Sequence, residues 1–440
     1  MKYSLPGIIT LPFRPNAFTA SDRRGGFVPE TISFLVSNLI YSSSAYVVSF
    51  LIPYILTTTL MAAYSSGMQL LLILTSLFEL SFSTSFVRFY QLDNSVKYYN
   101  SVLQMLVFVI LAVSAHIFPM QLNNIFGLKN VGVSAEIFFL LIIAQLSWMY
   151  LKSWLLATGK LNILFTHSII ILILRVAAVI YHYSLGQNDI YSIFISTLFL
   201  PLIPSLVHLI YINLSIILSS ARQHRTGAKE TYSLTSEKFF SFISYSFTIH
   251  ISGVLYLYTA RYVILYLTGK NEQAVADMGY AMTFIGIILV FYSSFRNYFL
   301  ARLNINEESR IRKYLTKLER MKVIFVTGSI VVSLILSLIV LFIKPEYLSN
   351  NSVMFSFILF ESNFLLFYCG MITLLSKTMN YNRTEFIINL MRLIIVIVLC
   401  NTVLQYNLIL GFALVNISIA GIEYLFSIFV RKKIRDAISW

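Results

Sequence analysis

The chain has 440 residues, of which 58% are hydrophobic and only 11% are charged, and its formal net charge is +14. Soluble domains carry roughly 25% charged residues, and a soluble fold of this size could not bury so much apolar surface. The composition therefore excludes a soluble enzyme and indicates a protein whose helices lie in lipid.

Long apolar runs follow one another along almost the whole chain. A spanning helix needs about 20 mostly apolar residues, and lipid offers no partner for backbone polar groups. The runs do not alternate in the short segments of a transmembrane barrel. We predict an all-α polytopic membrane protein with about twelve transmembrane helices. In chain order the predicted spans are 31–53, 63–88, 99–118, 132–154, 161–183, 191–217, 239–266, 275–300, 322–343, 351–376, 384–406 and 408–430.

Lysine and arginine are distributed unequally between the two sides of this arrangement. Basic residues in short loops are enriched on the cytoplasmic side. With a cytoplasmic N-terminus, 25 of the 32 basic residues fall on that side. Those on the outer side are Lys129, Lys270 and Lys344, and those within spans are Arg175, Arg261, Arg296 and Arg392. We therefore predict two cytoplasmic termini, and we attribute the positive charge to orientation and lipid headgroups, not to nucleic acid.

The longest charged inner loop divides the predicted spans into two sets of six. We predict a cytoplasmic N-terminal tail at 1–30, a first six-helix bundle at 31–218 and a cytoplasmic connecting loop at 219–238. A second six-helix bundle at 239–430 and a cytoplasmic C-terminal tail at 431–440 follow. An even number of spans in each half gives both halves the same orientation, as in transporters built from parallel repeats.

No motif of a soluble enzyme accompanies the spans. The sequence contains no P-loop and no cluster of His, Cys and carboxylate residues with metal-ligand spacing. We expect no catalytic residues, no cofactor and no metal. The six histidines are scattered singly along the sequence, and we interpret those in or near spans as packed polar residues.

Hydroxyl side chains form a stripe along one face of the first predicted span. Ser33, Ser37, Tyr41 and Ser44 fall on the same side of an ideal helix, and a similar stripe follows the seventh span. Small hydroxylated residues favour close helix packing in membranes. The alternative is a water-filled cavity between the two halves, and the sequence leaves both interpretations open.

Ionisable residues within the spans are candidate functional groups, because intramembrane charges are costly and tend to be kept for function. The basic candidates are Arg175, Arg392 and Arg261, with Arg88 and Arg296 nearer the membrane surface. The acidic candidates are Glu79 and Glu361. The alternative is that these residues only form internal ion pairs.

Two stretches of the sequence resemble a known family. The first is YSSG at 64–67 followed by LFELSFSTSFVRFY at 77–90, and the second is RYVILYLTG at 261–269 followed by MGY at 278–280. They resemble the second helix and the seventh-to-eighth helix junction of Wzx-type O-antigen flippases, in the multidrug/oligosaccharidyl-lipid/polysaccharide (MOP) exporter superfamily. That family often has Asp before the arginine, where this chain has Ala260.

The resemblance implies the V-shaped, two-bundle fold of MATE-like exporters in the bacterial cytoplasmic (inner) membrane. It implies a flippase for undecaprenyl-pyrophosphate-linked oligosaccharide, the repeat unit of O-antigen or another surface polysaccharide, driven by an ion gradient. Implied partners are this lipid-linked oligosaccharide and membrane lipids, with the polymerase and chain-length proteins of the same pathway as a further option. The five arginines would then form a cationic cavity for pyrophosphate, and Glu79 or Glu361 would bind the coupling ion.

Two other functions compete with this interpretation. A multidrug or small-molecule exporter of the same superfamily should have an acidic and aromatic cavity, whereas arginines are as frequent as acids within these spans. A membrane-embedded polysaccharide polymerase usually needs a sizeable outer loop, and the predicted outer loops are short. The sequence therefore favours transport of an anionic cargo.

Overall fold

A computed structural model describes the chain as helices joined by short turns. The residues it describes are 55–79, 94–186, 189–225, 382–403 and 408–437, with isolated positions in 36–52, 82–86, 315–338 and 369–372. Within these residues there is no strand. The predicted all-α fold class is confirmed, while several of the twelve predicted spans lie outside the described residues.

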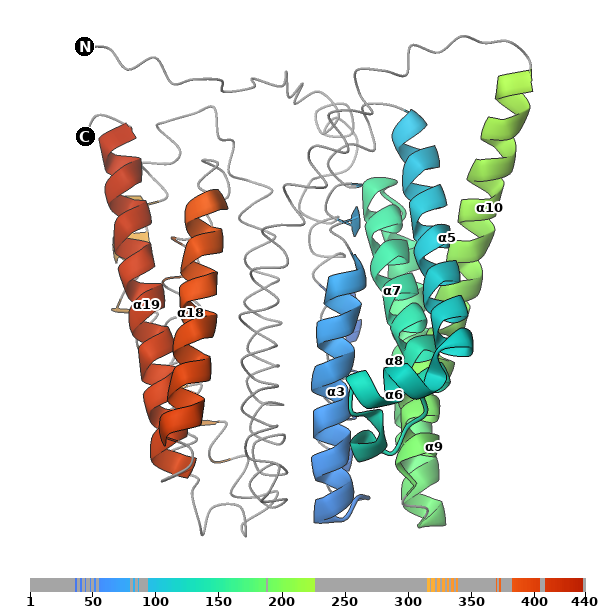
Figure 1. Cartoon of the computed structure of the whole chain (residues 1–440). Helices are drawn as coiled ribbons and strands as arrows, with labels where there is room; N and C mark the ends of the chain where they lie inside the picture. Colours follow the sequence, from blue (N-terminus) through green and yellow to red (C-terminus); the bar gives the residue numbers. More distant parts are fainter. Residues whose placement is uncertain are drawn as a thin grey trace.

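The described helices of the N-terminal half pack together as one group (Figure 1). They are α3 (Thr58–Glu79), α5 (Asn94–Ile117), α6 (Pro119–Ile125), η2 (Leu128–Val131), α7 (Ala135–Ala157), α8 (Leu161–Leu185), α9 (Ile190–Phe194), η3 (Ile195–Phe199), η4 (Leu200–Leu202) and α10 (Ile203–Arg225). Among the described residues, 5 helical stretches are long and apolar enough to cross a membrane. Four of them agree with the predicted spans to within three residues, whereas the first, Thr59–Glu79, begins before the predicted span 63–88 and its described part ends well short of residue 88.

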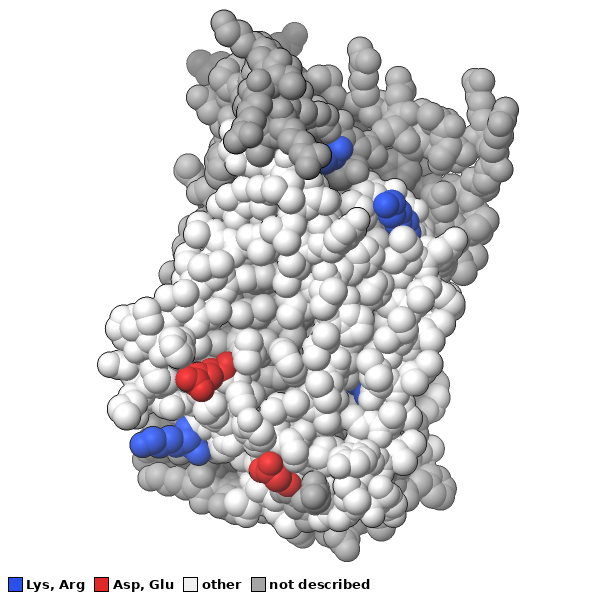
Figure 2. All heavy atoms as spheres, turned by 90° about the vertical axis from the view of Figure 1, so that its right-hand side faces the viewer, with Lys and Arg blue, Asp and Glu red and all other residues white. Residues whose placement is uncertain are grey.

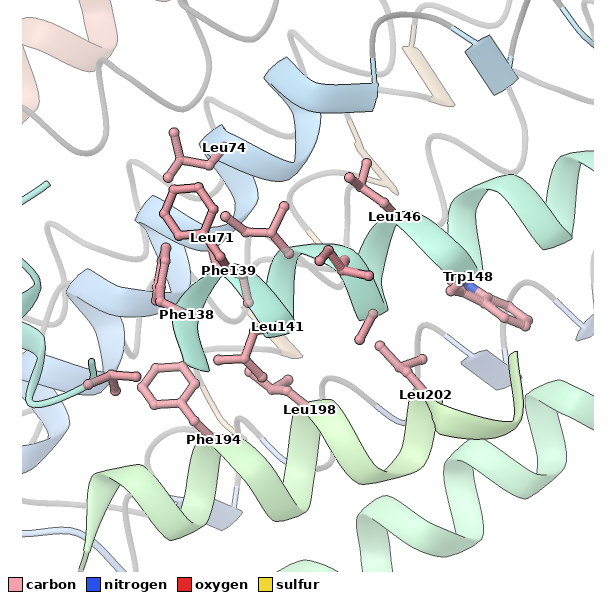
Figure 3. Close-up of a cluster of buried hydrophobic side chains, with 14 of the residues drawn as sticks. Leu71, Leu74, Phe138, Phe139, Leu141, Leu146, Trp148, Phe194, Leu198 and Leu202 are labelled. Atoms are coloured by element: carbon pink, nitrogen blue, oxygen red, sulfur yellow. The ribbon is translucent and has the colours of Figure 1, made fainter. Parts of the chain in front are cut away.

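Helix α7 lies at the centre of this group because its sequence is apolar on every side. A helix that is hydrophobic all round must be covered all round, and α7 packs against α3, α5, α8 and α10. Figure 3 shows Leu71 of α3, Phe138 and Phe139 of α7 and Phe194 of α9 meeting in the interior. These contacts fix the positions of the surrounding helices.

The outer face of the group is also apolar. Val109 and Val113 of α5 and Ile173 and Ile180 of α8 are all exposed. Figure 2 shows a broad, almost uncharged surface on which charged side chains lie mainly toward the two ends. A continuous apolar surface of this kind is rare in soluble proteins and suits contact with lipid.

The connection between α5 and α7 is ordered, which the hydropathy pattern did not predict. It forms the short helix α6 and the turn η2, with left-handed glycines at Gly127 (φ 62°) and Gly132 (φ 73°). Leu128 and Val131 of η2 are buried. This connection therefore covers one end of α3 and α7.

Helices α18 (Asn382–Val403) and α19 (Leu408–Ala437) lie side by side near the C-terminus (Figure 1). Helix α18 ends at Val403 and α19 begins at Leu408, close to the predicted boundary between the spans 384–406 and 408–430. Helix α19 continues past the predicted span to Ala437, and Arg431 in its last turns forms an ion pair with Glu319.

Gly67 marks the closest approach of α3 to its neighbours. A Cβ atom at this position would lie 2.5 Å from Cγ1 of Val131 and 2.8 Å from Cζ of Phe194. We predict that Gly67→Val lowers the free energy of unfolding by about 1–3 kcal/mol, because the added atoms must displace packed side chains. Thermal unfolding of the purified protein in detergent measures this loss.

Gly421 in α19 is the matched control. A Cβ atom there would meet nothing within 4 Å, and alanine is favoured over glycine inside a helix by about 0.5–1 kcal/mol. Gly421→Ala should therefore leave the melting temperature unchanged or raise it. A Gly67→Val protein as stable as the unmodified chain would contradict the packing of α3 described here.

Candidate functional site

The most deeply buried charge among the described residues is Arg175 of α8, whose side chain is only 1% exposed. Its Nη1 donates a hydrogen bond to Oγ of Ser44 at 2.8 Å. Its Nε donates to the backbone carbonyl oxygen of Thr197 at 3.2 Å. The guanidinium thus joins α8 to η3 and to the first helical segment of the chain.

The Thr197 carbonyl is available because Pro201 follows four residues later. In an α-helix this carbonyl would accept the N–H of residue 201, but proline has none. The chain adjusts by forming the π-helical η3 and the 3₁₀ turn η4 in place of regular α-helix, and such π segments often occur at functional sites. The predicted sixth span, 191–217, is therefore a continuous helix with an irregular middle, and the Thr197 carbonyl there accepts from Arg175.

Aromatic side chains cover the guanidinium. Its Cζ lies 5.1 Å from the centroid of the Tyr41 ring, and Tyr41 stacks on Trp148 of α7 with centroids 4.4 Å apart. The Tyr41 hydroxyl donates to Oε1 of Gln145 at 3.3 Å. A cation over the face of a tyrosine ring is stabilised by the ring quadrupole, so Tyr41 and Trp148 both position and compensate Arg175.

All of the polar partners that the described residues offer Arg175 are neutral. They are a hydroxyl, a carbonyl and an aromatic face, and the two hydrogen bonds use two of the five guanidinium N–H groups. A permanent positive charge is thereby held in an interior of low dielectric constant. Such a charge attracts anions strongly and repels cations.

Glu79, the last residue of α3, is also buried and is only 2% exposed. Its Oε1 accepts a hydrogen bond from the backbone N–H of Ser83 at 2.8 Å. The Tyr150 hydroxyl of α7 donates to the carbonyl oxygen of Phe78 at 3.2 Å. The carboxyl group therefore satisfies the backbone N–H of Ser83, and Tyr150 ties the last turn of α3 to α7.

Arg392 lies in the interface between α18 and α19. It is 4% exposed, its Nη1 donates to Oδ1 of Asn389 at 3.0 Å, and its Cζ is 6.0 Å from the Phe426 ring centroid. Arg175 and Arg392 are thus each buried among their own helices. The other candidates, Arg88, Arg261, Arg296 and Glu361, lie outside the described residues.

The hydroxyl stripe of the first predicted span packs against the bundle where the structure describes it. Ser37 and Ser44 are fully buried, and Tyr41 reaches Gln145 of α7. For these residues the helix-packing interpretation is confirmed. The stripe on the seventh span lies outside the described residues.

Sequence reasoning missed the groups that hold Arg175. Tyr41 and Ser44 were identified only as members of a stripe, and Thr197, Gln145 and Trp148 were not identified. One signal was present, because Pro201 and Pro204 stand in the middle of an apolar run. Proline inside a spanning helix frees carbonyl oxygens that a nearby side chain must satisfy.

Known structures with this fold are transporters. Over 93% of its length the chain aligns with 95% of an inward-facing multidrug resistance MATE family transporter of the MOP superfamily, at a TM-score of 0.54 and 13% identity. The MATE transporter VcmN of Vibrio cholerae, in a mutant form, gives a TM-score of 0.54 at 13% identity, with 93% of this chain and 96% of that chain covered.

A third aligned structure is a MOP superfamily transporter from Pyrococcus furiosus, with a TM-score of 0.50, 13% identity, and 93% and 95% of the two chains covered. For that protein, reverse polarity of the binding pocket is reported to suggest a different function. No protein-family model and no curated protein matches the sequence. The chain therefore has the fold of MATE transporters, and the fold prediction is confirmed at this level.

The hydrogen bond from Arg175 to the Thr197 carbonyl should contribute to the free energy of unfolding. Arg175→Met leaves the buried Thr197 carbonyl without its donor, and an unsatisfied buried acceptor costs about 1–3 kcal/mol. Pro201→Ala supplies a backbone N–H that can replace the lost donor. We therefore predict that the double variant regains much of the stability lost in Arg175→Met, measured by thermal unfolding in detergent.

Pro204→Ala is the control for this cycle. The carbonyl that Pro204 leaves without an α-helical donor is that of Leu200, which already accepts the N–H of Ile203. This change should not rescue Arg175→Met. Strictly additive losses for Arg175→Met and Pro201→Ala would show that the two residues do not act on the same carbonyl.

Proposed function

We propose that the chain is a bacterial inner-membrane transporter that moves an anionic, undecaprenyl-pyrophosphate-linked oligosaccharide from the inner to the outer leaflet. The fold supports transport, because solved structures with this fold are transporters. The resemblance at 64–67 and 77–90 to polysaccharide flippases supports the class of cargo. The positive charge of Arg175 supports a negatively charged cargo.

The observation that carries the proposal is the buried Arg175 with neutral partners. A pyrophosphate crossing an apolar slab needs a compensating cation, because an isolated anion is prohibitively unstable in hydrocarbon. Arginine keeps its charge at every relevant pH, and its planar fork matches phosphate oxygens. A lipophilic cation entering the same interior would instead be repelled.

Export of cationic drugs is the second candidate, because aligned structures include multidrug resistance transporters. The polarity of the interior separates the two functions. Arg175 places a positive charge where α8, η3 and Tyr41 meet, and a MOP superfamily transporter with a pocket of reverse polarity is already known. We therefore favour the anionic cargo. Polymerisation of sugars is less well supported, since the aligned structures are transporters.

Arg175→Ala should reduce surface polysaccharide at least tenfold in a bacterial strain that lacks its own flippase and depends on this chain. Loss of a charged hydrogen-bond donor is worth about 1.5–3 kcal/mol, and 1.4 kcal/mol is a factor of ten. Arg175→Lys should retain part of the export, because a point charge remains but the fork is lost. Arg431→Ala is the matched control, because Arg431 forms a partly exposed ion pair with Glu319.

The Arg175→Met/Pro201→Ala variant separates cargo binding from a structural role. If Arg175 serves only to satisfy the Thr197 carbonyl, the second change should restore export together with stability. The proposal requires that export stays low although the protein accumulates normally in the membrane. Restored export from this variant, or resistance to lipophilic cations that depends on the chain, would favour the alternative functions.

Glu79 tests the coupling ion. Glu79→Gln keeps an oxygen that can accept the N–H of Ser83 but cannot bind or release a proton, whereas Glu79→Leu removes both. If Glu79 binds the coupling ion, both variants should lose export, and only Glu79→Leu should lower the melting temperature by several degrees. Normal export from Glu79→Gln would restrict Glu79 to its structural role as the acceptor of the Ser83 N–H.

A further inference from the structure

Two histidines that are 41 residues apart in the sequence meet between α8 and α10. Nε2 of His167 lies 2.9 Å from Nδ1 of His208, and the rings stack with centroids 5.2 Å apart. Oγ of Ser205 lies 3.4 Å from Nδ1 of His167. His167 is 9% exposed and His208 is half-buried. The two histidines, interpreted from the sequence as packed polar residues, thus pack against each other.

A distance of 2.9 Å between two imidazole nitrogens is that of a hydrogen bond, with one hydrogen between them. One nitrogen donates its N–H and the other accepts with its lone pair. The pair can carry one extra proton and keep this bond, with one imidazolium donating to one neutral imidazole. A second extra proton removes the accepting lone pair, breaks the bond and places two like charges in contact.

The surrounding charges act in the same direction. The elements packed against α8 and α10 are α5, α7, α9, η3 and η4. The only ionisable residue within α9, η3 and η4 is Tyr191. The ionisable residues of α5 and α7 are Lys97, Tyr98, Tyr99, His116, Glu136, Tyr150 and Lys152, and α8 and α10 add Arg175, Tyr181, His182, Tyr183, Tyr211, Arg222, His224 and Arg225. The charge that acts directly on His208 is Lys160, which opposes a second positive charge on the pair.

A metal ion fits this geometry less well than a proton. Two histidine nitrogens that bind one tetrahedral zinc ion at about 2.0–2.1 Å are about 3.4 Å apart, whereas 2.9 Å is a hydrogen-bond distance. Among the described residues no group of three or more metal-ligand side chains is present. Lys160 would also repel a divalent cation.

We propose that His167 and His208 form a proton-binding dyad that takes up the ion driving the transport proposed above. The dyad lies seven residues, or about 10 Å, along α8 from the exposed Lys160 at the start of that helix, so protons can reach it from this end. It joins α8 to α10, while Arg175 joins α8 to η3 on the other side of Pro201. The number of protons on the dyad therefore acts on the helices that hold Arg175.

Nitrogen NMR of the full-length protein, labelled with ¹⁵N-histidine, tests the dyad without any cargo. The chain has only six histidines. We expect a through-hydrogen-bond coupling between two imidazole nitrogens at neutral pH, and two protonation steps separated by about one pH unit or more. His208→Gln should abolish the coupling and leave a single step for His167, whereas the control His116→Gln, at an exposed site on α5, should change neither.

The second arm asks whether the dyad drives transport. In liposomes holding the purified protein and an undecaprenyl-pyrophosphate-linked oligosaccharide, a pH gradient should stimulate flipping several-fold, and His167→Gln/His208→Gln should abolish that stimulation. Independent single-step titration of the two histidines would overturn the dyad, and full stimulation in the double variant would overturn its coupling role. If the unmodified protein flips no such lipid, the proposed function fails, while the titration still decides the proton site.

Discussion

The carbonyl oxygen of Thr197 constrains the first bundle, because the residue that would donate to it in an α-helix is Pro201. Inside a membrane every backbone polar group must be satisfied by protein, and Pro201 removes the N–H that would do so. Arg175 supplies the missing donor from α8. Pro201 accounts for the irregular middle of the sixth span, and the side-chain donor that replaces the backbone donor is a buried permanent charge covered by the Tyr41 ring.

This arrangement places a positive charge inside the bundle where α8, η3 and Tyr41 meet. Helix α7 provides the rigid apolar centre against which α3, α5, α8 and α10 pack, and the polar contacts of Arg175 connect the helices at its edge. Burial of the guanidinium against neutral partners is costly by itself. Under the proposed function, an anionic cargo offsets this cost during transport, which accounts for the neutral partners that the described residues give Arg175.

Much of the fold could be predicted from the sequence. The apolar runs predicted α7 and α8 to within three residues and the starts of α3 and α5 to within five, because length and hydropathy determine what can cross a membrane. They could not reveal the turn η2 or the irregular turn at η3, which depend on local proline and glycine geometry. Arg175 was recognised because a charge in an apolar run is conspicuous, but its partners lie on helices that only the tertiary packing brings together. The His167–His208 pair was missed for the same reason, since each residue stands alone in the sequence.

A direct binding measurement tests whether the buried charge of Arg175 selects an anionic cargo. The purified full-length chain in lipid nanodiscs is titrated with a fluorescent undecaprenyl-pyrophosphate-linked oligosaccharide, with inorganic pyrophosphate or a lipophilic phosphonium cation as competitor. If Arg175 selects an anionic cargo, the lipid-linked oligosaccharide binds saturably, and pyrophosphate displaces it whereas the phosphonium cation does not. Saturable binding of the cation, with no binding of the lipid-linked oligosaccharide, would contradict this selection.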